Sequence, residues 1–174
     1  MQTTHEVAWL NALDPDSARR ELLKCCGSRA WAEEVEQCRP FASVEQLIAR
    51  ANEVWWTLQP SDWLEAFRSH PKIGERKPAG AVSPQSQQWS SQEQQSVQHA
   101  ASGTIDRLAR LNADYEQKFG FIFIVCATGK SSDEILALLE SRIENDPAAE
   151  LRIAAAEQAK ITDLRLRKLL VRES

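Results

Sequence analysis

The sequence predicts an all-α fold: a single domain spanning residues 1–174, built as a bundle of about seven to nine helices with one short extended segment near residues 121–127. Three observations support this prediction. Apolar residues recur every three or four positions along most of the chain, capping patterns precede these stretches, and only residues 121–127 form a strongly β-prone run. A length of 174 residues with 43% hydrophobic residues suits one compact core.

Start signals divide the first part of the chain into short helices. Asp14-Pro15-Asp16-Ser17 marks a turn and the start of a helix, and Gly27-Ser28 ends that helix and begins the next. Ser43-Val44-Glu45-Gln46 is a capping-box pattern, and apolar residues at helical spacing follow it. We expect this third helix to end before Pro60, with Ser61 capping a shorter helix.

The middle of the chain contains a predicted loop. His70-Pro71 ends the helix that Ser61 begins, because proline disfavours helical geometry in the residue before it. Residues 77–88 are rich in Pro, Gly, Ser and Gln, which predicts a loop, and helical spacing resumes over residues 91–118 until Gly120.

The β-prone run separates this helix from the last two. Residues 121–127 are apolar without alternation, which predicts burial on all sides, and a lone strand needs partners other than a ladder for its amides and carbonyls. Ser131-Ser132-Asp133-Glu134 is another capping box, and Asn145-Asp146-Pro147 breaks the helix that follows. A final helix is expected to run to about residue 171.

Composition restricts the classes of function. The net charge of −4 disfavours a nucleic acid or an anionic membrane as partner and favours a small molecule or a protein. The four cysteines lack C-x-x-C spacing, so we expect reduced, mostly buried thiols and no metal site. The N-terminus has no signal-peptide pattern and the longest apolar run is too short to cross a bilayer. A cytoplasmic protein is therefore expected.

His70 is the first candidate for chemistry. Histidine exchanges protons near neutral pH, and Pro71 holds this one at a helix end. Ser90, Glu93 and Gln94 are expected on the first turn of the following helix, where free backbone N–H groups attract anions. Each has a structural alternative: His70 as a cap or core histidine, and Ser90 with Glu93 as a capping box.

Two further candidates lie in the C-terminal half. Arg165 is flanked by leucines, where its guanidinium can clamp a carboxylate, although a solvated position or an intrahelical partner is the commoner outcome. Gly129-Lys130-Ser131 resembles the end of a phosphate-binding P-loop, but the glycine required five positions before Gly129 is Ile124. Gly129 is then predicted to be a turn residue and Lys130 a solvated charge.

Four motifs in this order resemble a known family, 2-oxo-4-hydroxy-4-carboxy-5-ureidoimidazoline (OHCU) decarboxylase. The likeness runs from about Trp63 to Leu170, and the region before Trp63 contributes little to it. The motifs are His70-Pro71-Lys72-Ile73-Gly74-Glu75, Ser90-x-x-Glu93-Gln94, Leu111-Asn112-x-x-Tyr115-x-x-Lys118-Phe119-Gly120 running into residues 121–127, and Lys160-Ile161-x-x-Leu164-Arg165-Leu166.

The resemblance implies an all-helical, homodimeric carboxy-lyase of urate catabolism that needs no metal or organic cofactor and converts OHCU into (S)-allantoin and CO2. It implies that His70 is the catalytic proton donor and that Glu93 contacts the bound ring and ureido group, from where its carboxylate could orient the imidazole or shuttle protons with it. It also implies a set of substrate-binding residues: Pro71, Ser90, Gln94, the backbone of Phe123, Ile124, Val125, Cys126 and Ala127, and Arg165.

Two alternatives belong to other classes. A non-catalytic helical binding module would keep the caps and core but would not need His70. A phosphate-binding enzyme would instead need Gly129-Lys130-Ser131.

Overall fold

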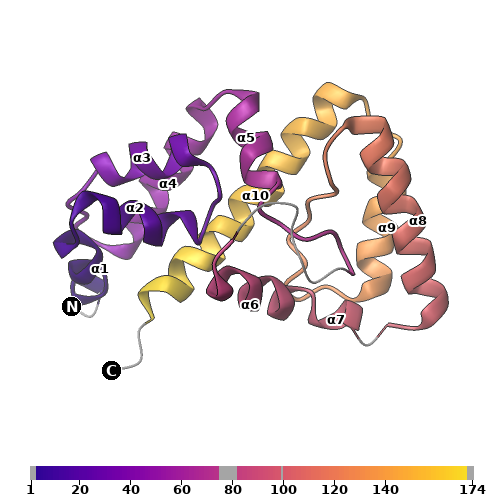
Figure 1. The fold of residues 1–174 in the computed structure, drawn as a ribbon, viewed down its shortest axis with the longest axis horizontal. Coiled ribbons are helices and arrows are strands. Elements are labelled where there is room, and N and C mark those ends of the chain that lie inside the picture. Colours follow the sequence, from indigo (N-terminus) through magenta and orange to yellow (C-terminus); the bar gives the residue numbers. More distant parts are fainter. Residues whose placement is uncertain (1–2, 75–81, 99, 172–174) are drawn as a thin grey trace. The chain divides into compact units, whose positions relative to one another are not determined.

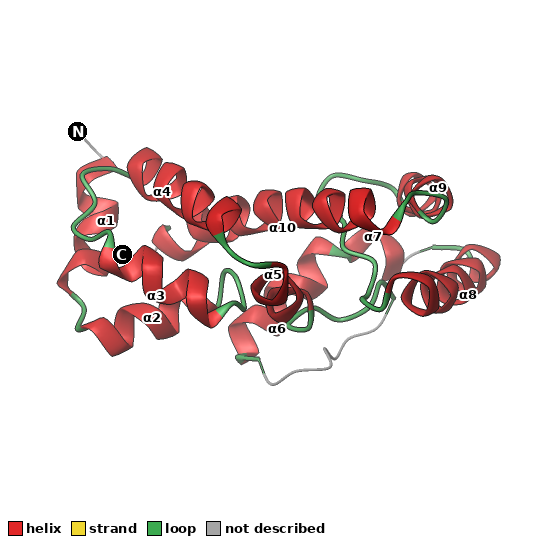
Figure 2. Cartoon of the chain, turned by 90° about the horizontal axis from the view of Figure 1, so that it is seen from above, coloured by secondary structure: helices red, strands yellow, loops and turns green. Residues whose placement is uncertain are grey.

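The computed structural model describes residues 3–74, 82–98 and 100–171. These residues form ten helices, one more than the predicted range, and no strand (Figures 1 and 2). The all-α prediction is confirmed. The helices are α1 (Thr3–Ala12), α2 (Pro15–Leu23), α3 (Arg29–Gln37), α4 (Val44–Thr57), α5 (Pro60–Phe67), α6 (Pro84–Glu93), α7 (Gln95–Gln98), α8 (Ser102–Phe119), α9 (Ser132–Arg142) and α10 (Pro147–Leu170).

Internal contacts divide the chain into two compact units. Unit 1 comprises Met1–Ala66 and Ala159–Ser174, and unit 2 comprises Phe67–Gln158. Helix α10 contributes residues to both, since its first half belongs to unit 2 and its second half to unit 1.

Three of the four caps predicted in unit 1 are present. The side chains of Asp14, Ser28 and Ser43 accept hydrogen bonds from backbone amides in the first turns of α2, α3 and α4. Helix α2 packs on α3, α3 on α4, and α1 on α4. Helix α5 begins at Pro60, which makes Gln59 its N-cap, so the prediction that Ser61 caps it is wrong by two residues.

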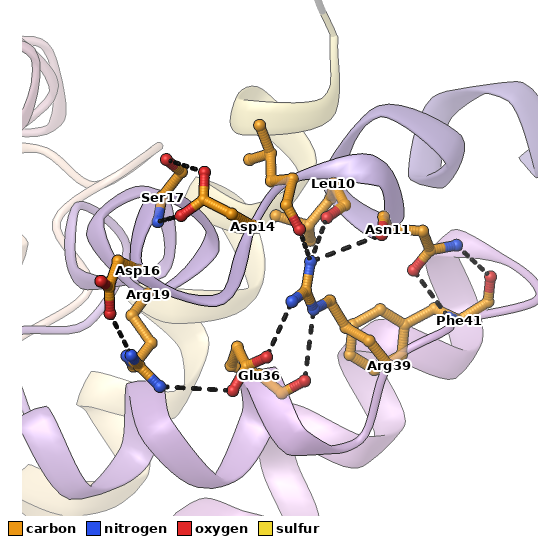
Figure 3. A network of polar contacts seen from close by, with 10 residues as sticks. Leu10, Asn11, Asp14, Asp16, Ser17, Arg19, Glu36, Arg39 and Phe41 are labelled. Atoms are coloured by element: carbon orange, nitrogen blue, oxygen red, sulfur yellow. Dashed lines mark hydrogen bonds and ion pairs between the residues drawn. The ribbon is translucent and has the colours of Figure 1, made fainter.

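Helix α1 was not predicted, because its apolar residues follow no helical stripe. Figure 3 shows how the chain around it is held. The guanidinium of Arg39 donates to the carbonyl oxygens of Leu10 (2.9 Å) and Leu13 (2.7 Å) and contacts the carboxylate of Glu36 (2.7 Å). Arg39 therefore bonds carbonyls at and just beyond the end of α1, where the amides of a continuing helix are missing.

The core of unit 2 lies between α8, α9 and the segment that joins them. Helix α8 packs against α9, and it ends at Gly120, which adopts the left-handed conformation (φ 81°) that favours glycine. The buried cluster consists of Ile73, Val97, Leu108, Tyr115, Phe123, Val125, Ala127, Ile135 and Leu139.

The predicted boundary between loop and helix in unit 2 is wrong. Residues 75–81 lie outside the described residues, but the predicted loop also included residues 84–88, which are helical. Ser83 is the N-cap of α6, with its Oγ accepting from the amide of Ser86 (3.1 Å), and Pro84 occupies the first helical position. The predicted helix over residues 91–118 is interrupted after Glu93 and again before Ser102.

Candidate active site

His70 lies directly after α5, as predicted. Its backbone amide donates to the carbonyl of Phe67 (3.1 Å), and both His70 and Pro71 are buried. The imidazole Nε2 lies 2.6 Å from Oε1 of Gln158, a fully buried residue in the first half of α10. The turn after α5 therefore presents His70 to α10 within unit 2.

Ser90, Glu93 and Gln94 lie at the C-terminal end of α6, not on the first turn of a helix as predicted. Ser90 and Gln94 are buried and Glu93 is partly exposed. Because the last carbonyls of a helix carry partial negative charge, the expected attraction for anions does not apply at this end.

Gln94 ties this helix end to the turn that contains His70. Its Oε1 accepts a hydrogen bond from the amide of Gly74 (2.9 Å). A second bond holds the same turn from the other side, since Asn112 Nδ2 of α8 donates to the carbonyl of Ile73 (3.3 Å). Two of the predicted groups, the His70 turn and the end of α6, are therefore brought together.

The apolar segment before α9 forms neither helix nor strand. Phe123 to Ala127 are buried, as predicted, whereas Phe121 and Ile122, for which the sequence also predicts burial, are half-buried. Side chains bond several of its backbone groups. Arg142 Nη1 donates to the carbonyl of Ile124 (2.7 Å), and the amide of Cys126 donates to Glu157 Oε1 (3.2 Å). Lys130 Nζ donates to the carbonyl of Cys126 (2.9 Å), so the prediction of a solvated Lys130 is wrong.

A buried ion pair between Arg142 and Glu150 holds this segment through the bond from Arg142 to Ile124. The carboxylate of Glu150, fully buried at the start of α10, contacts Arg142 Nη2 (2.6 Å), Tyr115 Oη (2.6 Å) and Asn145 Nδ2 (3.0 Å). The Arg142 guanidinium also lies over the ring of Phe123, 4.5 Å from its centroid. Burial, followed by the hydrogen bond to Glu150, raises the pKa of Tyr115 well above its ordinary value.

The carboxylate of Glu93 is one of the charges that act on Cys126. Burial raises the pKa of the Cys126 thiol; the ammonium of Lys130 opposes this, and the carboxylates of Glu157 and Glu93 add to it. Glu93 and residues 123–127 belong to the same unit.

Arg165 belongs to unit 1, where it is 2% exposed. Burial raises the pKa of the Cys25 thiol, and the positive charge of Arg165 partly opposes that rise. Burial likewise raises the pKa of Cys26 to about 12, with Arg165 among the opposing causes. The charge of Arg165 therefore acts on both thiols, and its contact with a substrate stays a prediction.

Two cavities are lined by residues outside the predicted site. A groove of about 440 Å³ lies in unit 1 between α4 and the second half of α10, lined by Trp31, Trp55, Lys160 and Asp163 among others. A cavity of about 230 Å³ in unit 2 begins at Lys72-Ile73-Gly74, directly after the His70-Pro71 pair. Neither includes the imidazole of His70.

Sequence reasoning missed Arg142, Glu157 and Gln158. The last two do carry a signal, because they interrupt the apolar stripe of α10 with polar side chains that are 8% and 0% exposed. A polar residue at a stripe position is typical of a buried hydrogen bond. Arg142 has no such signal, since its partners are distant in sequence or lie on the backbone.

Other chemistry finds little support in the described part of the chain. Gly129 is a turn residue with φ 77°, as predicted, and Lys130 N donates to the carbonyl of Ala127 (3.0 Å). Within residues 3–74, 82–98 and 100–171, no group of three His, Cys, Asp or Glu side chains is arranged to hold a metal ion. Among the same residues, no helix is both long and apolar enough to span a bilayer.

Comparisons with known proteins point to one family. A family model described as OHCU decarboxylase matches residues 11–167, so the likeness extends well before Trp63, contrary to expectation. The chain is 35% identical over 133 residues to 2-oxo-4-hydroxy-4-carboxy-5-ureidoimidazoline decarboxylase of Amia calva, covering 76% of this chain and 75% of that protein. It is 30% identical over 158 residues to the protein of the same name from Haloferax volcanii, with coverages of 90% and 91%.

A longer relative and a solved structure point to the same family. The chain is 39% identical over 146 residues to the uric acid degradation bifunctional protein TTL of Arabidopsis thaliana; the match covers 83% of this chain but only 45% of the length of that protein. A crystal structure of OHCU decarboxylase in the presence of (S)-allantoin matches with a TM-score of 0.75 and 37% identity, covering 88% of this chain and 99% of that one.

Proposed function

Because the chain belongs to the OHCU decarboxylase family, we propose that it decarboxylates OHCU to (S)-allantoin and CO2 in urate degradation, without a cofactor. The observation that carries this proposal is His70, a buried imidazole held between the end of α5 and α10. Gln94, Glu93 and residues 123–127 are gathered in the same unit.

The substrate supplies its own electron sink. In OHCU the hydroxyl and the departing carboxylate are both bonded to ring carbon 4. The neighbouring carbon 5 is joined to a nitrogen by an imine double bond. When the bond to CO2 breaks, its electron pair can flow towards that nitrogen. The product gains one hydrogen on carbon 5 and one on the nitrogen. One of these protons comes from the hydroxyl, which becomes a carbonyl, and the other comes from solution.

The protein must therefore orient the carboxylate and deliver a proton to one face of carbon 5. We assign proton delivery to His70, because an ordinary imidazole exchanges protons near pH 6.5. Glu93 assists His70 as an orienting or shuttling carboxylate. The proposed substrate ligands are Pro71, Ser90, Gln94, Arg165 and backbone groups of Phe123, Ile124, Val125, Cys126 and Ala127.

The assembly of the chain belongs to the same proposal. We expect a homodimer in the cytoplasm. We also expect that it binds neither nucleic acid nor membrane, because a net charge of −4 disfavours binding to anionic partners. We also expect the two units to belong to one domain, because the family match spans residues of both.

The deciding experiment follows freshly generated OHCU by circular dichroism. The wild type is expected to speed its decay and to leave the signal of (S)-allantoin, whereas His70→Ala should leave the slow decay to racemic product. His5→Ala, which removes another histidine, is the control and should behave as the wild type. If the wild type does not change the spontaneous decay, the proposed function is wrong.

A further inference from the structure

Gln158 contacts the His70 imidazole, and it lies outside every predicted site motif. Its side chain is fully buried on α10, and its Oε1 is 2.6 Å from Nε2 of His70. Its neighbour in sequence, Glu157, accepts the amide of Cys126 at 3.2 Å. Two consecutive residues of one helix thus hold the imidazole and the apolar segment.

The chemistry of this contact decides which ring nitrogen carries the proton. A carboxamide oxygen only accepts hydrogen bonds, so Nε2 of His70 must donate. A neutral imidazole has a single N–H, and Nδ1 is then the basic nitrogen. The opposite tautomer would set two lone pairs against each other at 2.6 Å in a buried place, where an unmatched polar pair is costly.

We propose that Gln158 is a positioning residue that holds neutral His70 as the Nε2–H tautomer and thereby assigns proton exchange with the substrate to Nδ1. The second half of this inference rests on the proposed function. It also sets an order of events, because Nδ1 must accept a proton before it can donate one. The hydroxyl on carbon 4 supplies that proton, and carbon 5 receives it after CO2 has left, so that the imidazole ends the cycle neutral.

The first test needs no substrate. Imidazole ¹⁵N resonances of the labelled, full-length protein report which ring nitrogen is protonated, and His70→Ala identifies the signals of His70 among the three histidines. At a pH where the ring is neutral, the wild type should show Nε2–H. Gln158→Met, of similar length but without the carboxamide acceptor, should shift His70 towards a mixture of tautomers. Gln158→Glu keeps an acceptor and should retain Nε2–H.

Two outcomes would overturn the inference: an Nδ1–H tautomer in the wild type, or no change in Gln158→Met. Thermal unfolding checks that the variants fold, and Gln158→Leu is the replacement if the methionine variant does not. This test stands even if the wild type lacks decarboxylase activity, so failure of the proposed function and failure of the tautomer assignment are distinguishable.

The second test is kinetic. Loss of a partner that orients a reacting imidazole is expected to lower kcat of Gln158→Met by about tenfold to a hundredfold, with little change in KM. Gln158→Glu should recover a large part of kcat. Thr162→Val is the matched control, since it also removes a buried polar group from α10 but at a side chain that bonds Cys26. An unchanged kcat, or a change in KM alone, in Gln158→Met would contradict a positioning role.

Discussion

Glu150 and Arg142 form a buried ion pair, and each of the two residues contacts further groups. The side chain of Glu150 is fully buried, and Tyr115, Asn145 and Arg142 compensate its charge there. Arg142 then extends to the carbonyl of Ile124 in the proposed substrate-binding segment. A charge that is buried with partners is tolerated, whereas one that loses its partner is strongly destabilising.

We predict that Arg142→Met lowers the free energy of unfolding by about 3–5 kcal/mol, because Glu150 stays buried without its cation. Urea denaturation measures this loss. Arg107→Met is the control: it removes a cation from an ion pair with Glu140 that is half exposed, and should cost less than about 1 kcal/mol. Equal losses in the two variants would contradict the role given to burial.

The thiols of Cys25 and Cys26 give the protein an alkaline limit. Burial raises the pKa of Cys25, and raises that of Cys26 to about 12, whereas an unfolded thiol has a pKa of about 8.5. Above that pH the unfolded chain binds fewer protons than the folded one. The free energy of unfolding therefore falls as pH rises, by about 1.4 kcal/mol per pH unit for each such thiol.

We predict that Cys25→Ala makes this fall less steep, by about 1.4 kcal/mol per pH unit well above pH 9. The variant lacks one of the two thiols that keep their proton in the folded state and lose it on unfolding. Urea denaturation at several pH values between about 8 and 11, with reductant present, gives the slope. Val35→Ala is the control, since it also truncates a buried side chain of unit 1 but carries no titrating group. It should lower stability at every pH and leave the slope unchanged.

At the scale of elements, α6 decides where three proposed site residues lie. It begins at Ser83-Pro84, so Ser90, Glu93 and Gln94 fall on its last turn and beyond. The combination of a capping serine and a proline at the first helical position is a start signal. The composition of residues 77–88 hides this signal, because the glutamines that follow Pro84 are typical of a loop.

We predict that Ser83→Ala destabilises the protein by about 1 kcal/mol, because the amide of Ser86 loses its acceptor at the start of α6. The midpoint of urea denaturation measures the change. Ser61→Ala serves as control, since Ser61 is exposed in the first turn of α5 and should change stability by less than about 0.5 kcal/mol. A larger effect at Ser61 than at Ser83 would contradict the assignment of the cap.

Elements with local signals were predictable, and elements held by distant partners were not. Ser28, Ser43 and Ser131 each cap the helix that the sequence assigns to them, because a cap involves residues only three apart. Helix α1 has no stripe and depends on contacts with residues about thirty positions away, such as those of Arg39. Local patterns carry no information about such contacts.

The same distinction applies to the site. His70 was found because Pro71 and the family motif mark it locally, whereas its partner Gln158 is 88 residues distant. The burial of residues 123–127 was legible in their composition. The identity of the side chains that bond them was not, because Arg142, Glu157 and Lys130 come from three different places in the chain.

At the scale of the whole molecule, we predict a particle of about twice the chain mass of 19.6 kDa, because the family resemblance implies a homodimer. Light scattering coupled to size-exclusion chromatography measures the mass directly. Dilution over a wide range of concentration is the control for weak association, since a stable dimer should keep its mass. A mass equal to one chain at all concentrations would contradict this prediction.

The hydrogen bonds to the backbone of residues 123–127 have a consequence for how the site can be observed. Amide hydrogens outside helices and strands usually exchange rapidly with solvent, but that of Cys126 is bonded to a buried carboxylate of α10. Its exchange requires that Glu157 and the segment separate. Slow deuterium uptake at this single amide would therefore act as a clock for the opening of the site, readable in the absence of any substrate.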